Sequence, residues 1–398
     1  MGFTFLKTAP PKGINESDWN SWSWQLRSSL KTEEDFKRYF ELTSEEEKVF
    51  GGKEVFNIRT TPYYAALTKP SPFDPLRRIL MPHAKELAEG NQQMLDPLGE
   101  RKTANAPTAR VIHRYSDRAL FLITDLCSVY CRYCTRKHFT GQDQAFIRNS
   151  EYDEALSYIK KTTGLKEIIL SGGDPLTVSN SQLDRVLTDL RSIDHVEIIR
   201  IGTRMPVVCP QRIDEDLVKI IRKNKPVFLM THFNHPRELT EESARAVELF
   251  VDNGVPVMNQ MVLLNGVNNH PAIVQALSRR LLFLRAKPYY MFQCDPSIGT
   301  DHLRTSVDES LEIQRELWGH LSGLAMPTLS LDIPDGGGKT YLVPNFQTEI
   351  TPQKRKFTGW DGVNAEYVNP PPEQKILPLD VEDYMEEWME IKSSKALF

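Results

Sequence analysis

The sequence has few cysteines, only five in 398 residues, and three of them lie within eight positions. An odd number clustered in this way does not form the disulfide framework of a secreted domain. No apolar run approaches the roughly 20 residues of a membrane helix, and the opening MGFTFLKTAPPKG lacks the apolar segment of a signal peptide. Basic and acidic side chains are nearly balanced, 49 against 53, so the positive field of a nucleic-acid-binding protein is missing. These absences favour a cytoplasmic protein with small-molecule partners and exclude nucleic-acid and membrane binding.

The middle of the chain alternates short β-branched runs with amphipathic stretches whose apolar residues lie three and four positions apart. This alternation predicts strands and helices in turn, and hence a parallel sheet with right-handed crossovers. Six units favour an incomplete (β/α)6 barrel, similar to a TIM barrel, although a doubly wound α/β sheet shows the same alternation. In both folds the chemistry lies at the carboxyl ends of the strands. The predicted strands span residues 119–126, 166–171, 196–203, 227–233, 255–263 and 288–294.

The alternation divides the chain into three predicted regions. Residues 1–110 are polar and carry helix-start signals, such as Glu16-Ser17-Asp18 and Thr43-Ser44-Glu45, which predict a helical N-terminal region. Residues 111–303 contain the predicted barrel. Residues 304–398 contain one further helix, a strand-like TLSLDI, a glycine-rich loop and a proline-rich tail.

Cys127, Cys131 and Cys134 form a C-x3-C-x2-C pattern directly after the first predicted strand. Three thiolates can hold a [4Fe–4S] cluster by three irons and leave the fourth iron open to a small ligand. The alternative is a structural zinc ion with His138 as its fourth ligand, since thiolates also suit zinc. Cys209 and Cys294 have no such spacing, and we expect them to be free buried thiols.

Two glycine-rich segments each follow a predicted strand or a strand-like run. Ser171-Gly172-Gly173-Asp174-Pro175 comes after the second predicted strand; alone it is typical of a turn. Near the end, PDGGGKT places Lys339 after three glycines, and a phosphate-binding P-loop is excluded because Ile333 stands where that motif requires glycine. A lysine in such a loop can form a Schiff base with pyridoxal phosphate (PLP), or it can be an exposed turn residue.

Taken together, these motifs resemble known families. The cysteine pattern, with Tyr133 before the last cysteine, resembles the radical S-adenosylmethionine (SAM) superfamily, and with the later PxGGGK motif the chain resembles the lysine 2,3-aminomutase family. The resemblance covers almost the whole chain. It includes DWNSWSWQLR at 18–27, HRYSDRALFLITDLCSVYCRYCTRKHFTGQ at 113–142, LSGGDPL at 170–176, IRIGTRMPVVCPQRI at 199–213, NQMVLLNGVN at 259–268 and YYMFQCD at 289–295.

The resemblance implies three cofactors: a [4Fe–4S] cluster on the three cysteines, SAM chelated to its open iron, and PLP. Reduction of the cluster, by a reductase or a flavodoxin or ferredoxin donor, would cleave SAM to a 5′-deoxyadenosyl radical and later re-form it. The SAM contacts implied by the match are Tyr133, Ser171, Gly172, Gly173, Asp174 and Gln260. The PLP contacts are Lys339, which carries the Schiff base, with Arg114, Arg118 and His232.

The implied reaction moves the α-amino group of an amino acid to its β-carbon, an isomerisation. Asp295 and Asp332 match the positions that grip the ε-ammonium of lysine, and Arg136 matches the arginine for the substrate carboxylate, where a bidentate fork fits. Two unit charges 4 Å apart interact by roughly 4 kcal/mol at an effective dielectric of 20, so two carboxylates favour a cationic side chain. The resemblance therefore implies conversion of L-lysine to β-lysine. The alternatives are the same shift on arginine or another amino acid and, from another class, a zinc-stabilised binding module without catalysis.

The sequence departs from the family in its last residues. Some members bind zinc between subunits through C-terminal cysteines, but this tail has none, and Asn269 and His270 follow GVN, so we expect no structural zinc. A homo-oligomer, dimer or tetramer, remains the expectation, and VEDYMEEWMEI predicts a terminal helix, packed on a neighbour or solvated. Phe292 stands where lysine enzymes can have tyrosine.

Overall fold

A curved sheet of nine strands is the framework of the computed structural model, which describes residues 3–50, 56–88, 90, 92–141, 145–370, 378 and 381–393. The strands follow chain order, with β2 to β8 parallel and with β1 and β9 antiparallel to their neighbours. Because β1 and β9 stand at the two ends of this order, the described strands leave the barrel open along one seam. The strands are β1 (Val111–Tyr115), β2 (Arg118–Thr124), β3 (Glu167–Gly172), β4 (Ile198–Gly202), β5 (Val227–Thr231), β6 (Val257–Leu263), β7 (Ala286–Gln293), β8 (Thr328–Ile333) and β9 (Gly338–Tyr341).

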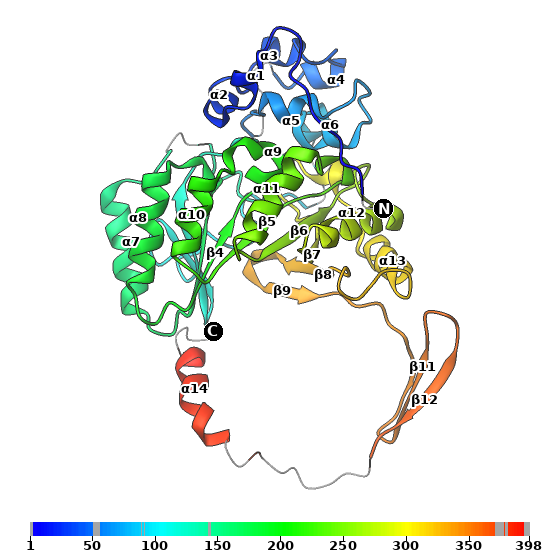
Figure 1. Ribbon diagram of the computed structural model, residues 1–398. Coiled ribbons are helices and arrows are strands. Elements are labelled where there is room, and N and C mark those ends of the chain that lie inside the picture. The colour runs from blue at the N-terminus through cyan, green and yellow to red at the C-terminus, as the bar shows by residue number, and fades with distance from the viewer. Residues whose placement is uncertain are drawn as a thin grey trace.

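Each strand from β2 to β7 leads into a helix on the outside of the sheet (Figure 1). This arrangement confirms the predicted incomplete (β/α)6 barrel, and β1, β8 and β9 extend it. The doubly wound alternative is wrong because every consecutive pair of strands is adjacent, with no reversal of order. The helices are α7 (Asn149–Lys161), η2 (Pro175–Thr177), α8 (Asn180–Arg191), α9 (Met205–Val208), η3 (Pro210–Arg212), α10 (Glu215–Lys223), η4 (Pro236–Glu238), α11 (Glu241–Asp252), α12 (Pro271–Phe283), η5 (Asp301–Leu303) and α13 (Val307–Leu317).

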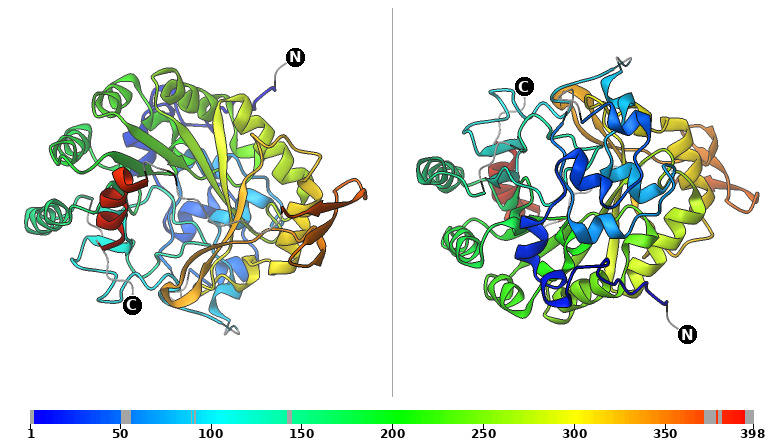
Figure 2. Two further views of the ribbon diagram at one scale, coloured as in Figure 1. Left: turned by 90° about the horizontal axis from the view of Figure 1, so that it is seen from below. Right: turned by 90° about the horizontal axis from the view of Figure 1, so that it is seen from above.

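Short helices of the N-terminal residues lie over one end of the barrel (Figure 2, right). Side chains of Thr32 and Thr43 cap two of these helices in reciprocal capping boxes with Asp35 and Glu46, which explains why such short segments are helical. The helices are α1 (Glu16–Trp19), α2 (Trp22–Arg27), α3 (Glu33–Lys37), α4 (Ser44–Glu47), α5 (Pro62–Ala66), α6 (Pro75–Leu80) and η1 (Ala84–Leu87).

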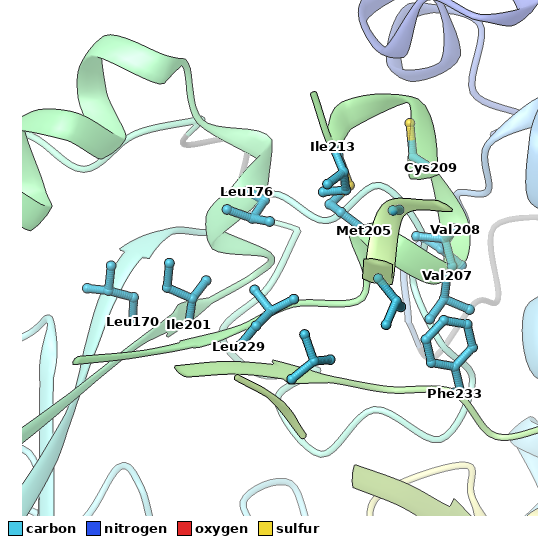
Figure 3. Close-up of a cluster of buried hydrophobic side chains, with 14 of the residues drawn as sticks. Leu170, Leu176, Ile201, Met205, Val207, Val208, Cys209, Ile213, Leu229 and Phe233 are labelled. Carbon is cyan, nitrogen blue, oxygen red and sulfur yellow. The ribbon is translucent and has the colours of Figure 1, made fainter. Parts of the chain in front are cut away.

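The core continues from the strands to the helices at their carboxyl ends. Leu170, Ile201 and Leu229, from β3, β4 and β5, pack in one cluster with Met205 and Val207 of α9 (Figure 3). All five side chains are fully buried. This packing fixes the loop that leaves β4, and with it the residue immediately before α9.

The C-terminal region differs from its prediction in two places. The expected glycine-rich loop is only a short turn, η6 (Pro334–Gly336), and Lys339 lies on strand β9, because Gly338 to Tyr341 pair with β8. A separate three-stranded sheet that was not predicted lies between β9 and the expected proline-rich tail: β10 (Gln347–Ile350), β11 (Lys354–Thr358) and β12 (Asn364–Val368). Residues 371–377 of that tail lie outside the described residues. The predicted terminal helix is present as η7 (Val381–Tyr384) and α14 (Met385–Ser393). In Figure 1 the three-stranded sheet projects away from the barrel.

Within the described ranges, no helix combines the length and the apolar character that a membrane crossing requires.

Candidate active site

A cavity of about 800 Å³ runs through the inside of the barrel. At the carboxyl ends of the strands it is lined by the three clustered cysteines and the Ser171–Asp174 segment, and at the opposite end by Glu167, Ile198 and Phe228. Every residue predicted to bind a cofactor or substrate lines this one cavity. These residues are Arg114, Arg118, Cys127, Cys131, Tyr133, Cys134, Arg136, Ser171, Gly172, Gly173, Asp174, His232, Gln260, Asp295, Asp332 and Lys339.

The clustered cysteines are free thiols in the loop after β2, at the carboxyl end of the barrel. Burial, and then the neighbouring thiols, raise the pKa of both Cys127 and Cys134 above the ordinary value. Such thiols lose their protons when a metal centre binds them. Among the described residues no three metal-ligating side chains converge on the position of one ion. His138, the proposed fourth zinc ligand, instead hydrogen-bonds through Nδ1 to the Leu95 carbonyl at 3.1 Å.

The Ser171–Asp174 segment packs directly against the start of the cysteine loop. The backbone N–H groups of Gly173 and Asp174 donate to the carbonyls of Thr124 and Leu126, at 2.7 and 2.8 Å. A Cβ atom on Gly173 would lie 2.2 Å from the Leu126 carbonyl oxygen, so a larger residue does not fit. Gly173 therefore lets this segment lie close to the backbone of the cysteine loop. This requirement for glycine is separate from the SAM contact that the sequence predicts.

The Asp174 carboxylate is already well hydrogen-bonded within the protein. It accepts from the Thr203 hydroxyl at 2.6 Å and from the backbone N–H groups of Arg204 and Leu176 at 2.7 and 3.0 Å. Burial nevertheless raises its pKa above the ordinary value. Asp174 thus joins the loops after β3 and β4. We refer to one group of residues as the cysteine side of the cavity: Cys127, Cys131, Cys134, Ser171–Asp174 and Arg204.

Lys339 lies opposite Asp332 in the antiparallel register of β8 and β9. Its Nζ donates to Asp332 Oδ2 at 3.0 Å and lies 4.8 Å from the centre of the Phe292 ring. Its backbone N–H donates to the Tyr115 hydroxyl at 2.9 Å, a contact that connects β9 with β1 across the seam. We refer to Arg114, Tyr115, Asp295, Asp332 and Lys339 as the lysine side of the cavity.

Several charged atoms on the lysine side lack a partner among the described residues. Arg114 Nε and Nη2 and Asp332 Oδ1 are buried and have no hydrogen-bond partner in the part of the chain that the structure describes. Burial, and then the Asp332 carboxylate, raise the pKa of Asp295 to about 7. Buried unpaired charges are costly, so these atoms indicate bound ligands: an anionic group beside Arg114 and a cationic group beside the two aspartates.

The remaining predicted PLP and SAM residues lie on both sides of the cavity. Arg118 pairs with Asp117 at 2.6 Å and stacks over the Tyr115 ring. His232, after β5, hydrogen-bonds Gln260, and burial lowers its pKa to about 4, so its imidazole is neutral at pH 7. Tyr133 is buried, and its hydroxyl accepts from Asn234 Nδ2 at 2.7 Å.

The structure changes the expected geometry at Arg136. Its Nε and Nη2 atoms donate to the two carboxylate oxygens of Glu100, at 2.8 and 2.7 Å, and Nη1 donates to Ser171 Oγ at 2.9 Å. Although burial alone would raise the pKa of Glu100, the Arg136 guanidinium lowers it below the ordinary value. A substrate carboxylate can therefore reach only the outer Nη1–Nη2 edge of this arginine, because Glu100 takes the other edge.

Sequence reasoning did not single out Glu100, Arg204 and Tyr115. Glu100 lies outside any periodic or motif-bearing segment, so no local signal marks it. Arg204 follows a predicted strand at its carboxyl end, which is where functional residues gather in such barrels. That position is the signal that could have identified it.

Residues 121–275 match the family model of the Radical SAM superfamily, and residues 314–396 match the model named Lysine-2,3-aminomutase. With three cysteines after the first parallel strand of an open barrel, the fold and the site define a radical SAM enzyme. The chain is 44% identical to L-lysine 2,3-aminomutase of Clostridium subterminale over 361 residues, 90% of this chain and 86% of that relative. It is 42% identical to the Bacillus subtilis enzyme of that name over 377 residues, 94% and 79% of the two chains.

The chain belongs to the lysine 2,3-aminomutase family, whose members are isomerases that use a [4Fe–4S] cluster, SAM and PLP. It is also 38% identical to glutamate 2,3-aminomutase of Clostridioides difficile over 351 residues, 87% and 82% of the two chains. Membership in an enzyme family rules out the zinc-stabilised module without catalysis as the account of this chain. The grouped thiols, the unpartnered Arg114 atoms and the lysine amine inside one cavity fit the three cofactors.

Proposed function

We propose that this chain converts L-lysine to β-lysine by moving the amino group from C2 to C3. The single observation that carries the choice of substrate is the pair Asp295 and Asp332, which line the cavity beside Lys339. Two carboxylates attract an ammonium group at the end of the substrate side chain and repel a carboxylate there. Arginine also carries a terminal cation and is the second candidate, whereas glutamate is disfavoured.

When bound, the reduced cluster and SAM supply a carbon-centred radical, and PLP carries the amino group that migrates. Cys127, Cys131 and Cys134 would hold the cluster; Tyr133, Ser171, Gly172, Gly173, Asp174 and Gln260 would contact SAM. Lys339 would hold PLP through its amine. The unpartnered Nε and Nη2 atoms of Arg114 would bind an anionic oxygen of PLP, with Arg118 and the neutral His232 nearby.

The chain's own residues would orient the substrate between these groups. Arg136 would bind the α-carboxylate through its outer edge, in a position that Glu100 and Ser171 maintain. Asp295 and the free Oδ1 atom of Asp332 would bind the ammonium. Binding at both ends would restrict lysine to one orientation, and orientation of this kind lowers the barrier.

The working protein needs two partners beyond its substrate, and we propose both. One is a one-electron donor, such as a reductase, flavodoxin or ferredoxin, because cluster reduction starts the chemistry. The thiolate-held cluster also requires a reducing compartment, which supports a cytoplasmic location.

The other partner is a second copy of the chain, because large apolar side chains are exposed along the three-stranded sheet and α14. They include Ile350, Trp360, Tyr367, Val368 and Trp388.

Sedimentation of the full chain tests the second partner. We expect a dimer or larger assembly, and the double variant Tyr367→Ser, Val368→Ser should dissociate it, because both side chains are exposed on β12. A parent protein that sediments as a monomer would contradict this part of the proposal.

The reaction itself is tested by an anaerobic assay of the iron-reconstituted protein with SAM, PLP and a strong reductant. Lysine, arginine and glutamate are offered separately, and β-amino acids are resolved by chromatography. β-Lysine as the preferred product supports the proposal. Preference for arginine would leave the mechanism intact and overturn the choice of substrate, whereas no β-amino acid from any of them, with cluster and PLP bound, would overturn the reaction.

A further inference from the structure

The guanidinium of Arg204 touches one of the clustered cysteines. Its Nη1 atom donates to Cys131 Sγ at 2.9 Å. Arg204 directly follows the loop residue Thr203 after β4, and the residue is almost fully buried, with 8% of its surface exposed. A charged donor is therefore held against the sulfur atom that the proposed function assigns to the cluster.

The other atoms of Arg204 fix its orientation. Its backbone N–H donates to Asp174, while Nε donates to the His232 carbonyl at 3.3 Å. Nη2 donates to the Tyr64 hydroxyl at 2.8 Å and to Glu238 Oε1 at 2.7 Å. The next residue, Met205, begins α9, whose side chains are locked in the core cluster of Figure 3. The guanidinium therefore cannot leave Cys131 without breaking its contacts with His232, Tyr64 and Glu238.

Glu238 provides the opposite charge. It binds Nη2 of Arg204, whereas Nη1 contacts the cysteine. Its side chain is fully buried and accepts further hydrogen bonds from the Tyr64 hydroxyl at 2.6 Å and from the backbone N–H of His235 at 3.0 Å. The Arg204–Glu238 pair is thus neutral as a whole but asymmetric. The guanidinium of the pair donates to the sulfur, whereas the carboxylate accepts its other hydrogen bonds from Tyr64 and His235.

We propose that Arg204 is a positioning residue that sets the reduction potential of the cluster, through its hydrogen bond to Cys131. This inference rests on the proposed function, because it requires a cluster on the three cysteines. Reduction adds one electron to the cluster and raises the negative charge on its sulfur ligands. A cationic donor at a ligating sulfur stabilises that charge, and hydrogen bonds to sulfur are among the known determinants of cluster potentials. Arg204 therefore makes the cluster easier to reduce.

The test compares midpoint potentials in anaerobic redox titrations of reconstituted protein, without SAM or PLP, followed by the electron paramagnetic resonance signal of the reduced cluster. Arg204→Gln removes the cation and should lower the potential, whereas Glu238→Gln removes the opposing anion and should raise it. A tenfold change in the equilibrium between the two oxidation states corresponds to about 59 mV for one electron. The double variant Arg204→Gln, Glu238→Gln should return towards the parent value.

Potential shifts of opposite sign in the two single variants distinguish an effect of charge from an effect of disrupted packing. Disrupted packing would shift the potential of both variants in the same direction. Arg204→Lys keeps the charge and tests the donor alone if the glutamine variant does not fold; we expect a smaller decrease. Arg212→Lys is the matched control, since Arg212 is fully buried and, within the described residues, donates only to the carbonyls of Leu176 and Val178. Its potential should equal that of the parent.

Unchanged potentials in the Arg204 variants, or shifts of the same sign for Arg204→Gln and Glu238→Gln, would overturn the inference while leaving the proposed function in place. A parent protein that takes up no iron and sulfide on reconstitution would overturn both. A change confined to SAM affinity, at an unaltered potential, would also overturn the inference by assigning Arg204 to the ligand.

Discussion

The cysteine side and the lysine side of the cavity differ in how completely the protein satisfies their polar groups. On the cysteine side, the Asp174 carboxylate accepts three hydrogen bonds and the nitrogen atoms of the Arg204 guanidinium all donate to protein atoms. On the lysine side, Arg114 and Asp332 keep buried polar atoms without a partner among the described residues. The cysteine side is thus organised by the protein alone, whereas the lysine side is completed by its ligands.

This difference follows from what each side has to hold. A cluster needs its thiolates kept in one arrangement, and a network of hydrogen bonds around the loop provides that rigidity. PLP and an amino acid instead bring their own charges, so charges of opposite sign must remain unpaired until they bind. The comparison predicts that substitutions on the lysine side act on the binding of PLP and the amino acid, and that those on the cysteine side act on the cluster and SAM.

The largest effect expected on the lysine side comes from Lys339→Ala. Removing the only amine that we assign to PLP should abolish turnover, because none of the other residues assigned to PLP has an amine that can bind it covalently. The iron content and the cluster spectrum should stay at parent values, since Lys339 contacts Asp332 and Phe292 rather than the cysteine loop.

Absorbance in the visible range follows both cofactors in the same sample. Lys219→Ala is the control, because this lysine lies exposed on α10. Loss of the cluster from Lys339→Ala would contradict the independence of the lysine side and the cysteine side. Survival of the visible absorbance band of bound PLP in this variant would show that Lys339 does not have its assigned role.

Asp295→Asn should weaken lysine binding strongly without moving the cluster. Loss of one charged partner in a desolvated pair costs about 2 kcal/mol or more, so KM for lysine should rise about thirtyfold. Steady-state kinetics measure this change, with Asp252→Asn on the surface of α11 as the control. Lysine turnover with an unchanged KM would remove Asp295 from the ammonium site.

The acidity of Asp295 should make lysine binding depend on pH. Its folded-state pKa is raised to about 7 by burial, and then by Asp332, so the carboxylate exists above pH 7 and is lost as the pH falls through 7. The ammonium is then bound by one charge fewer, and kcat/KM should fall about tenfold per pH unit below 7 until it reaches the lower value of the enzyme with neutral Asp295. Asp295→Asn should lose this inflection. An inflection that persists in the variant would assign the titration to another group.

The smallest change expected is that of Glu100→Gln. The amide keeps one acceptor for Arg136 but loses the charge, so the free energy of unfolding should fall by about 1 to 3 kcal/mol. Arg136 becomes less well positioned, and KM for lysine should rise by a few-fold while kcat changes little. Denaturant titration and kinetics measure the two effects, with the exposed Glu45→Gln as control. A fall in kcat at constant KM would show that Glu100 acts on the chemical step instead.

The sequence predicted the barrel well because its strands and helices differ strongly in apolar periodicity. The predicted strand 227–233 corresponds to β5 (Val227–Thr231), and the predicted strand 255–263 to β6 (Val257–Leu263). The three-stranded sheet β10–β12 was not predicted. Its strands are short and mostly exposed, so they lack the alternation of buried and exposed residues that marks a strand.

The predicted site residues came from motifs, and the structure adds partners that no motif shows. Glu100 is 36 positions from Arg136, and Arg204 is 73 positions from Cys131. The first pair meets because the segment before β1 lies against the loop after β2, and the second because the barrel brings the loops after β2 and β4 together. Such contacts depend on the fold, and neither residue type nor spacing indicates them.

The central claim is that the two sides act on one substrate in one cavity, and transfer of deuterium tests it most directly. The reconstituted protein is incubated anaerobically with lysine deuterated at C3, and SAM and β-lysine are recovered for mass spectrometry. The account predicts deuterium at the 5′-carbon of SAM and in the β-lysine formed, because hydrogen passes from the substrate on the lysine side to the radical on the cysteine side and back. β-Lysine formed with no deuterium ever entering SAM would contradict the account.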